Sequence, residues 1–203
     1  GAITAFDSPF TEWLVQWPNE RTLLVTTKPS ANIDGYAYKI DVASKNMQKI
    51  IGNLPGLTTL MSPNGEKIVY SKSEQGSPNL YSLDLKTGQV NNLYLRTLPE
   101  KCAWSVKEKE SLYCAVPNEL AIADYPDVWY QGRISFNDSI WRINTQTGET
   151  RLFALIGSLA DEPIDVINPM LNPSEDYRMF QNKIDLSLWG LRLTNRTATP
   201  PTQ

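Results

Sequence analysis

Residues 62–70 read SPNGEKIVY, and residues 79–88 read NLYSLDLKTG. Together they give a tight turn, an apolar strand, a strand with an aromatic residue, and a second turn that ends in Gly. Three other segments follow the same order less closely, and the corresponding aromatic residues of the four segments are Tyr38, Tyr81, Trp141 and Trp189. These markers lie 43, 60 and 48 residues apart. A repeat of about 40–50 residues built from short strands is typical of a β-propeller, in which each repeat forms one blade.

The repeats predict an all-β fold of four blade-like, four-stranded antiparallel sheets. We expect a β-propeller segment over residues 1–195, part of a larger propeller, with blades at residues 11–53, 56–98, 100–156 and 162–194. The fourth repeat supplies only three strands of its own, whereas residues 2–6 have the length and place of an outer strand that no blade uses. Residues 2–6 either close the ring against the fourth repeat or belong to a preceding blade. Residues 196–203 are polar and rich in Pro, so we expect a flexible tail there.

The composition is that of an ordinary folded protein. Of the 203 residues, 41% are hydrophobic and 20% are charged. The net charge of −3 argues against a nucleic-acid partner, because phosphate binding needs clustered Lys and Arg. Glutamates interrupt Lys101, Lys107 and Lys109, and we expect these lysines to lie on a solvated hairpin.

No apolar run approaches the roughly 20 residues that span a bilayer, so we expect no membrane span within this chain. The chain starts at Gly1 rather than Met, which we interpret as a processing site or an artificial boundary, with any membrane anchor upstream.

The absence of histidine excludes Ser-His-Asp and Cys-His catalysis and His-ligated zinc. The sequence also has neither an Asp-rich calcium loop nor a Gly-rich phosphate loop. We therefore expect no catalytic residues, no metal and no cofactor. The rival hypothesis is a hydrolase with paired carboxylates. Asp41 and Asp84 occupy equivalent repeat positions, but Asn144 and Arg192 replace them later, so we interpret both aspartates as caps of turns.

Cys102 and Cys114 are placed symmetrically about the polar segment Lys107–Glu110. If a hairpin is centred there, the two cysteines face each other on adjacent strands, within reach of a disulfide. The alternative is a pair of buried thiols that act as small hydrophobic side chains. A disulfide would indicate an oxidising compartment.

A long insertion, residues 117–136, separates the second and third strands of the third repeat. It is rich in aromatic residues, and loops of this kind anchor protein partners. The alternative is that the insertion folds back over the propeller face as a plug. The candidate partner-binding residues are Tyr125, Asp127, Trp129 and Tyr130.

The stretches at residues 62–70 and 79–88 resemble the TolB-type, or WD40-like, β-propeller repeat. That repeat reads S-P-D-G-x-x-I-x-Y/F, followed by a strand of the form I-Y-x-x-D. This chain departs from it at Asn64, where Asp is usual, and at Glu20 and Glu175, where Gly is usual.

Further stretches, among them residues 101–105, 112–117 and 125–132, are similar to uncharacterised propeller proteins of uncultivated candidate-phylum bacteria. In that group such stretches fall in the C-terminal half of a longer chain, behind a membrane anchor and several earlier blades. The resemblance implies that these residues form half of a propeller, and it implies no activity.

The sequence therefore favours a non-enzymatic binding or scaffold module for protein–protein interaction, in an extracytoplasmic location that is periplasmic or at the cell surface. The partner is an unknown protein, and self-association through open blade ends is also expected. Two alternatives remain: a glycoside- or ester-hydrolase-like propeller, and a structural fragment that functions only after assembly with further blades.

Overall fold

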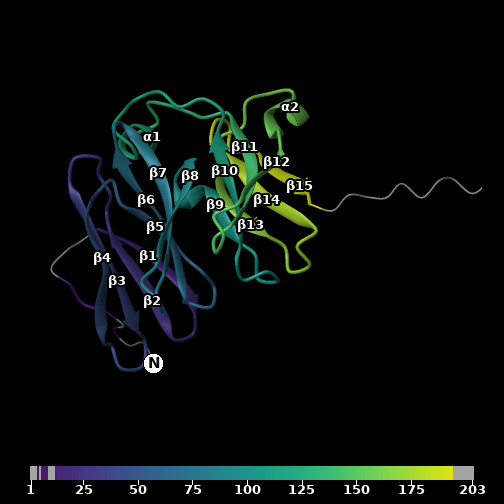
Figure 1. Ribbon diagram of the computed structural model, residues 1–203. Helices are drawn as coiled ribbons and strands as arrows, with labels where there is room; N and C mark the ends of the chain where they lie inside the picture. The colour runs from purple at the N-terminus through teal and green to yellow at the C-terminus, as the bar shows by residue number, and fades with distance from the viewer. Residues whose placement is uncertain (1–3, 5, 9–11, 194–203) are drawn as a thin grey trace, which may run out of the picture.

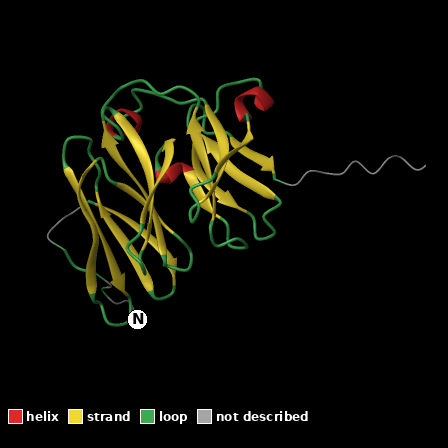
Figure 2. Ribbon diagram, viewed as in Figure 1, coloured by secondary structure: helices red, strands yellow, loops and turns green. Residues whose placement is uncertain are grey.

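The computed structural model describes residue 4, residues 6–8 and residues 12–193 (Figure 1). Fifteen strands dominate these residues, and the helical segments are short (Figure 2). The all-β propeller fold is confirmed, with successive antiparallel sheets that follow the chain order. The longest helix of the described residues, α2 (Ile156–Ala160), has five residues and is far too short to cross a membrane.

Each of the first three sheets has four strands in sequence order. The first contains β1 (Trp13–Asn19), β2 (Thr22–Thr27), β3 (Asp34–Asp41) and β4 (Met47–Pro55). The second contains β5 (Thr58–Met61), β6 (Lys67–Glu74), β7 (Ser77–Asp84) and β8 (Val90–Arg96). The third contains β9 (Cys102–Trp104), β10 (Ser111–Pro117), β11 (Asp138–Asn144) and β12 (Thr150–Ala154), with the 3₁₀ turn η1 (Pro99–Lys101) before it and the helix α1 (Asp127–Tyr130) between β10 and β11.

The fourth sheet has three described strands, which is the number that its repeat supplies in the sequence. Its described strands are β13 (Val166–Leu171), β14 (Tyr177–Asn182) and β15 (Leu188–Arg192), and they form a three-stranded sheet. Helix α2, which sequence patterns did not predict, precedes this sheet. The outer strand expected at residues 2–6 falls largely outside the described residues. Phe6 is described, and its ring packs edge-on against Trp13 of the first sheet at 5.5 Å.

The sharp turn between β5 and β6 shows why the repeat needs its polar residues. The Ser62 hydroxyl accepts a hydrogen bond from the Lys67 amide at 2.9 Å and donates to the Asn64 side chain at 2.6 Å. Gly65 has a φ of +70°, a left-handed conformation that Gly adopts without a steric cost. These contacts hold the two strands in register.

Apolar layers between successive sheets form the core. The layer between the first two sheets includes Leu24, Ala37, Leu57, Met61 and Ile68. The next layer includes Val69, Leu80, Leu93, Leu112 and Ile143, and the last includes Ala115, Ile140, Ile164, Val166 and Phe180. Three aromatic residues of the repeat are partly buried and pack against these layers: Tyr81 in the first, Trp141 in the second and Trp189 in the third. Tyr38 packs with Trp13 on the first sheet.

The sheets follow one another along an arc (Figure 1). The first and fourth sheets lie at opposite ends of it, so the described residues form an open row of blades.

Candidate functional site

The insertion forms a cap over one end of the blades; we use this name for residues 118–137. Figure 1 shows it leaving β10, reaching α1 beside the second sheet, and returning to β11. The Ala123 amide donates to the Gly76 carbonyl of the second sheet at 3.1 Å. The Ala31 amide, in the loop after β2 of the first sheet, donates to Asp127 Oδ2 at 2.7 Å. A segment of the third repeat therefore holds the first two blades as well.

The cap buries most of its aromatic surface. Tyr125 is 1% exposed and Trp129 is 4% exposed, and both belong to a cluster that includes Val128, Phe136 and Leu98. The Trp129 and Phe136 rings stack with their centroids 6.1 Å apart. The cap thus has the packing expected of a plug.

Trp129 fastens the cap to the fourth blade. Its indole Nε1–H lies 2.9 Å and 3.2 Å from the two carboxylate oxygens of Asp165, and the Phe136 amide donates to the same carboxylate at 3.1 Å. Asp165 immediately precedes β13. Hydrogen bonds to a charged acceptor are stronger than neutral ones, so this contact is a firm attachment.

Asp165 also belongs to a buried ion cluster, which consists of Lys101, Asp138, Asp165 and Arg178. All four residues are completely buried. Lys101 Nζ lies 2.5 Å from Asp165 Oδ1 and 2.8 Å from Asp138 Oδ2, and it donates to the Val166 carbonyl at 2.9 Å. Two positive and two negative charges balance, which is the arrangement that makes buried charge tolerable.

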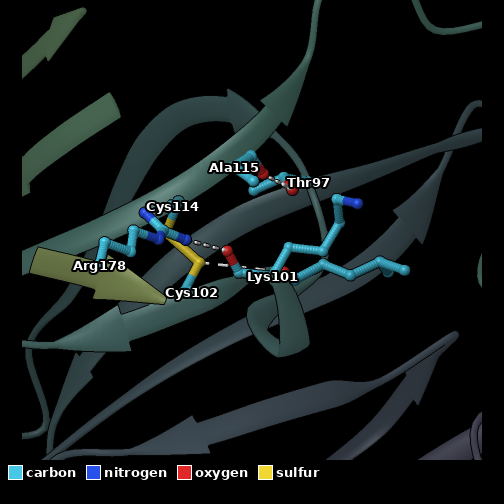
Figure 3. Close-up of a disulfide and its surroundings, with 7 residues drawn as sticks. Thr97, Lys101, Cys102, Cys114, Ala115 and Arg178 are labelled. Carbon is cyan, nitrogen blue, oxygen red and sulfur yellow. Dashed lines mark hydrogen bonds between the residues drawn. A yellow bond between two sulfur atoms is a disulfide. The ribbon is translucent and has the colours of Figure 1, made fainter. Parts of the chain in front are cut away.

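Burial shifts the ionisation of this cluster in the directions that desolvation dictates. It raises the pKa of Asp138 even though the Lys101 charge opposes the shift. It lowers the pKa of Arg178 to about 10. Arg178 Nη2 donates to the Lys101 carbonyl at 3.0 Å (Figure 3), whereas its Nε and Nη1 atoms and Asp138 Oδ1 have no hydrogen-bond partner among the described residues.

The expectation that Lys101 lies on a solvated hairpin is wrong. Lys101 ends η1, before the first strand of the third sheet, and its side chain is held inside by Asp138 and Asp165. Because the cluster is sealed from solvent, it has a structural role and offers no surface to a substrate.

Cys102 and Cys114 face each other across β9 and β10 in register, with their Cα atoms 4.0 Å apart. A disulfide joins them (Figure 3), and their sulfur atoms are 2.03 Å apart. The bond lies in the apolar layer between the second and third sheets, close to the Arg178 side chain that reaches the Lys101 carbonyl.

A cleft of about 820 Å³ opens between the first sheet and the cap; we call it the cap cleft. Its volume lies in the usual range for ligand sites in proteins. It combines aromatic, apolar and acidic side chains from four separate segments. Its lining consists of Glu12, Trp13, Leu14, Lys28, Pro29, Glu100, Asp127, Tyr130 and Gln131.

The carboxylates of the cap cleft differ in their surroundings. Glu12 pairs with Lys28 at 2.8 Å. Glu100 accepts a short hydrogen bond from the Tyr130 hydroxyl. Burial raises the pKa of Glu100, and neither this bond nor the nearby Lys101 charge offsets that effect. Among the contacts of the described residues, Glu100 has no direct cationic partner.

The structure divides the four predicted partner-binding residues into two pairs. Tyr125 and Trp129 are buried inside the cap, whereas Asp127 and Tyr130 line the cap cleft. Sequence reasoning missed Glu12, Trp13 and Glu100, which reach the cleft from other segments. No local pattern marks them, because the fold alone brings these segments together.

The recurring aspartates cap turns, as expected. Asp41 accepts from the backbone and hydroxyl of Ser44, and Asp84 accepts from the Lys86 and Thr87 amides. Asn144 accepts from two amides at the equivalent turn. Within the described residues, no group of three or more Cys, Asp or Glu side chains is arranged to hold a metal ion.

No protein-family model matches this chain, and no curated protein matches it significantly. Solved structures do resemble it. A protein assigned as TolB from Agrobacterium tumefaciens matches with a TM-score of 0.62 and 16% identity, over 93% of this chain and 60% of the other. TolB from Acinetobacter baumannii matches with a TM-score of 0.56 and 14% identity, over 88% of this chain and 42% of the other.

An oligogalacturonate lyase in complex with manganese is also similar, with a TM-score of 0.53 and 15% identity, over 87% of this chain and 46% of the lyase. The chain thus spans 60% or less of the length of each of these three proteins. These likenesses, together with the four successive sheets, show that the chain has a β-propeller fold of the kind seen in TolB.

Proposed function

We propose that this chain is a non-enzymatic binding module that recognises a protein partner at the cap cleft. The cleft itself carries the proposal. The cap turns Tyr125 and Trp129 inward, whereas its Asp127 and Tyr130 line the cleft together with Trp13 of the first blade. A mainly apolar cleft with a few converging polar groups is the usual form of a binding site.

The attachment of the cap supports this role. Hydrogen bonds to Gly76, Ala31 and Asp165 hold it to three other blades. The cleft walls are therefore fixed before a partner arrives, and a partner loses little free energy in ordering them.

An extracytoplasmic location is part of the proposal. The Cys102–Cys114 disulfide supports it, since disulfides form and persist mainly in oxidising compartments.

The scaffold role extends to the fourth sheet. The strand register places Met170, Met179, Gly190 and Leu188 on one face of this sheet. Met170 is 56% exposed and Leu188 is 67% exposed. An apolar blade face of this kind supports self-association, or contact with further blades.

The hydrolase alternative has less support. The lyase likeness extends to the fold, but Asp41 and Asp84 are occupied as turn caps. The ion cluster that does bring carboxylates together is sealed from solvent.

Selection of binding peptides tests the proposal. A displayed library of random dodecapeptides is panned on the oxidised protein, and enriched peptides are measured against Tyr130→Ser and against Tyr94→Ser. Tyr94 is 86% exposed on the second sheet, is not one of the lining residues of the cleft, and serves as the matched control.

We expect Tyr130→Ser to weaken binding at least tenfold and Tyr94→Ser to leave it unchanged. Equal binding to both variants would place the site elsewhere. Turnover of a glycoside or ester that is lost on replacing one carboxylate would favour the hydrolase instead.

A further inference from the structure

We propose that the cap cleft takes a basic side chain, Arg or Lys, from its partner. This inference rests on the proposed function and names the chemistry of the group that the cleft recognises. Its first support is the charge balance of the lining. Glu12 and Lys28 neutralise each other, which leaves Glu100 and Asp127 as two carboxylates without a salt bridge to any described residue.

Lys101, the cation next to Glu100 in the sequence, already pairs with other carboxylates. Lys101 follows Glu100 in the chain, but its ammonium group points into the interior and contacts Asp138 and Asp165. Glu100 is thus partly buried without a full counter-charge, and its raised pKa reflects this. A cation from a ligand would supply the missing charge where water is partly excluded, and there an ion pair is stronger than on an open surface.

In Glu100 and in Asp127, one carboxylate oxygen is already held by a hydrogen bond from a neutral donor. Glu100 Oε1 accepts the Tyr130 hydroxyl, and Asp127 Oδ2 accepts the Ala31 amide at 2.7 Å. The second oxygen of each group is left for a ligand donor, as far as the described residues show. The protein thus holds both carboxylates in place with neutral donors, so that a cation can bind them without rearrangement.

The aromatic residues of the cleft suit the same occupant. Trp13 and Tyr130 both line it, and aromatic faces attract ammonium and guanidinium groups by a cation–π interaction. The Trp13 ring is fixed edge-on by Phe6 at 5.5 Å and Tyr38 at 5.9 Å. A flat guanidinium can stack on an aromatic ring while its N–H groups reach carboxylates.

The geometry favours a side chain over a metal ion. The described residues hold no group of three acidic or Cys side chains close enough for metal coordination. A cleft of about 820 Å³ is also far larger than an ion requires and accommodates a long side chain with its neighbouring residues.

Two matched peptides test the charge requirement. Acetyl-Leu-Arg-Leu-amide and its citrulline counterpart have nearly the same shape, but only the first carries a positive charge. Both are titrated into ¹⁵N-labelled oxidised protein, and binding is followed by NMR at the Trp13 indole N–H and the Tyr130 amide. Glu100→Gln is compared with Glu149→Gln, because Glu149 is an exposed carboxylate in the turn before β12 and is not part of the cleft lining.

We expect the Arg peptide to bind at least tenfold more tightly than the citrulline peptide, with an affinity that falls as salt is added. Glu100→Gln should remove most of this difference, and Glu149→Gln should preserve it. Equal binding of both peptides at Trp13 would overturn the charge inference and leave the peptide site intact. If neither peptide shifts these signals in the folded protein, the result would count against the peptide site as well. The variants are compared only where their melting temperature is unchanged.

Discussion

Replacing Trp129 with Phe removes the indole N–H that joins the cap to the fourth blade. The donor lies 2.9 Å from a buried carboxylate oxygen of Asp165, and the Phe ring keeps most of the apolar packing against Phe136. A hydrogen bond to a charged group contributes about 1.5–3 kcal/mol, and the lost ring area adds a smaller amount. We therefore expect the free energy of unfolding to fall by about 2–4 kcal/mol.

Trp189→Phe is the matched control, because it makes the same chemical change in the fourth sheet. The Trp189 indole is partly exposed and donates to a neutral acceptor, the Ser187 hydroxyl, at 2.7 Å. Its loss should reduce stability by only about 0.5–1.5 kcal/mol.

Urea unfolding followed by far-UV circular dichroism measures both variants without depending on tryptophan fluorescence. Amide hydrogen exchange measures the local stability of the cap. Trp129→Phe should speed exchange in residues 118–137 more than elsewhere, and Trp189→Phe should not. Equal losses of stability in the two variants, or unchanged exchange in the cap, would refute the idea that Trp129 and Asp165 fasten it.

Three further predictions concern the disulfide, the ion cluster and one surface carboxylate. Reduction of the Cys102–Cys114 bond, which closes a short loop, should lower the free energy of unfolding by about 2–3 kcal/mol in urea titrations, and a variant with Ala at both positions should not respond to the reductant. Lys101→Met leaves two buried carboxylates without their cation and should lower the free energy of unfolding by about 3–5 kcal/mol near neutral pH. The loss should be smaller in acid, because the carboxylates then take up protons. An equal loss at both pH values would contradict the ion pairing. Burial alone would raise the pKa of Glu175, but hydrogen bonds from the Ser105 hydroxyl and nearby amides hold it below its usual range. Its stabilising effect is therefore present above the unfolded-state pKa and is lost as the pH falls through the folded one, so melting temperatures of Glu175→Gln and the parent should differ near neutral pH and converge in strong acid.

The sequence predicted those parts of the fold that local patterns encode. The turn at residues 62–65 and its two strands recur less closely in three other segments, so the blades could be recognised from this repeated order of turns, strands and aromatic residues. Cys102 and Cys114 could be placed opposite each other because a hairpin about one turn fixes their register. Helix α2 was missed because five residues are too few to show a helical period.

The ion cluster and the cap cleft could not be read from local patterns. Lys101, Asp138, Asp165 and Arg178 come from four separate segments. Lys101 follows Glu100 and precedes the charged run at residues 107–110, a pattern that normally indicates a solvated surface. The direction of each aromatic side chain in the cap was also undetermined. Tyr125 and Trp129 turn inward while Tyr130 remains 38% exposed, and this division depends on Asp165, far along the chain.

The cap also bears on how the chain folds. In a row of blades, each sheet contacts mainly its neighbours, so folding can spread along the chain as it does in other repeat proteins. The hydrogen bonds of the cap break this order, because they join Ala31 to Asp127 and Trp129 to Asp165. The first blade therefore gains its last contacts only after the third repeat has been synthesised, and the cap gains its own only when the fourth begins. Such distant contacts slow folding and make the blades unfold together rather than one by one.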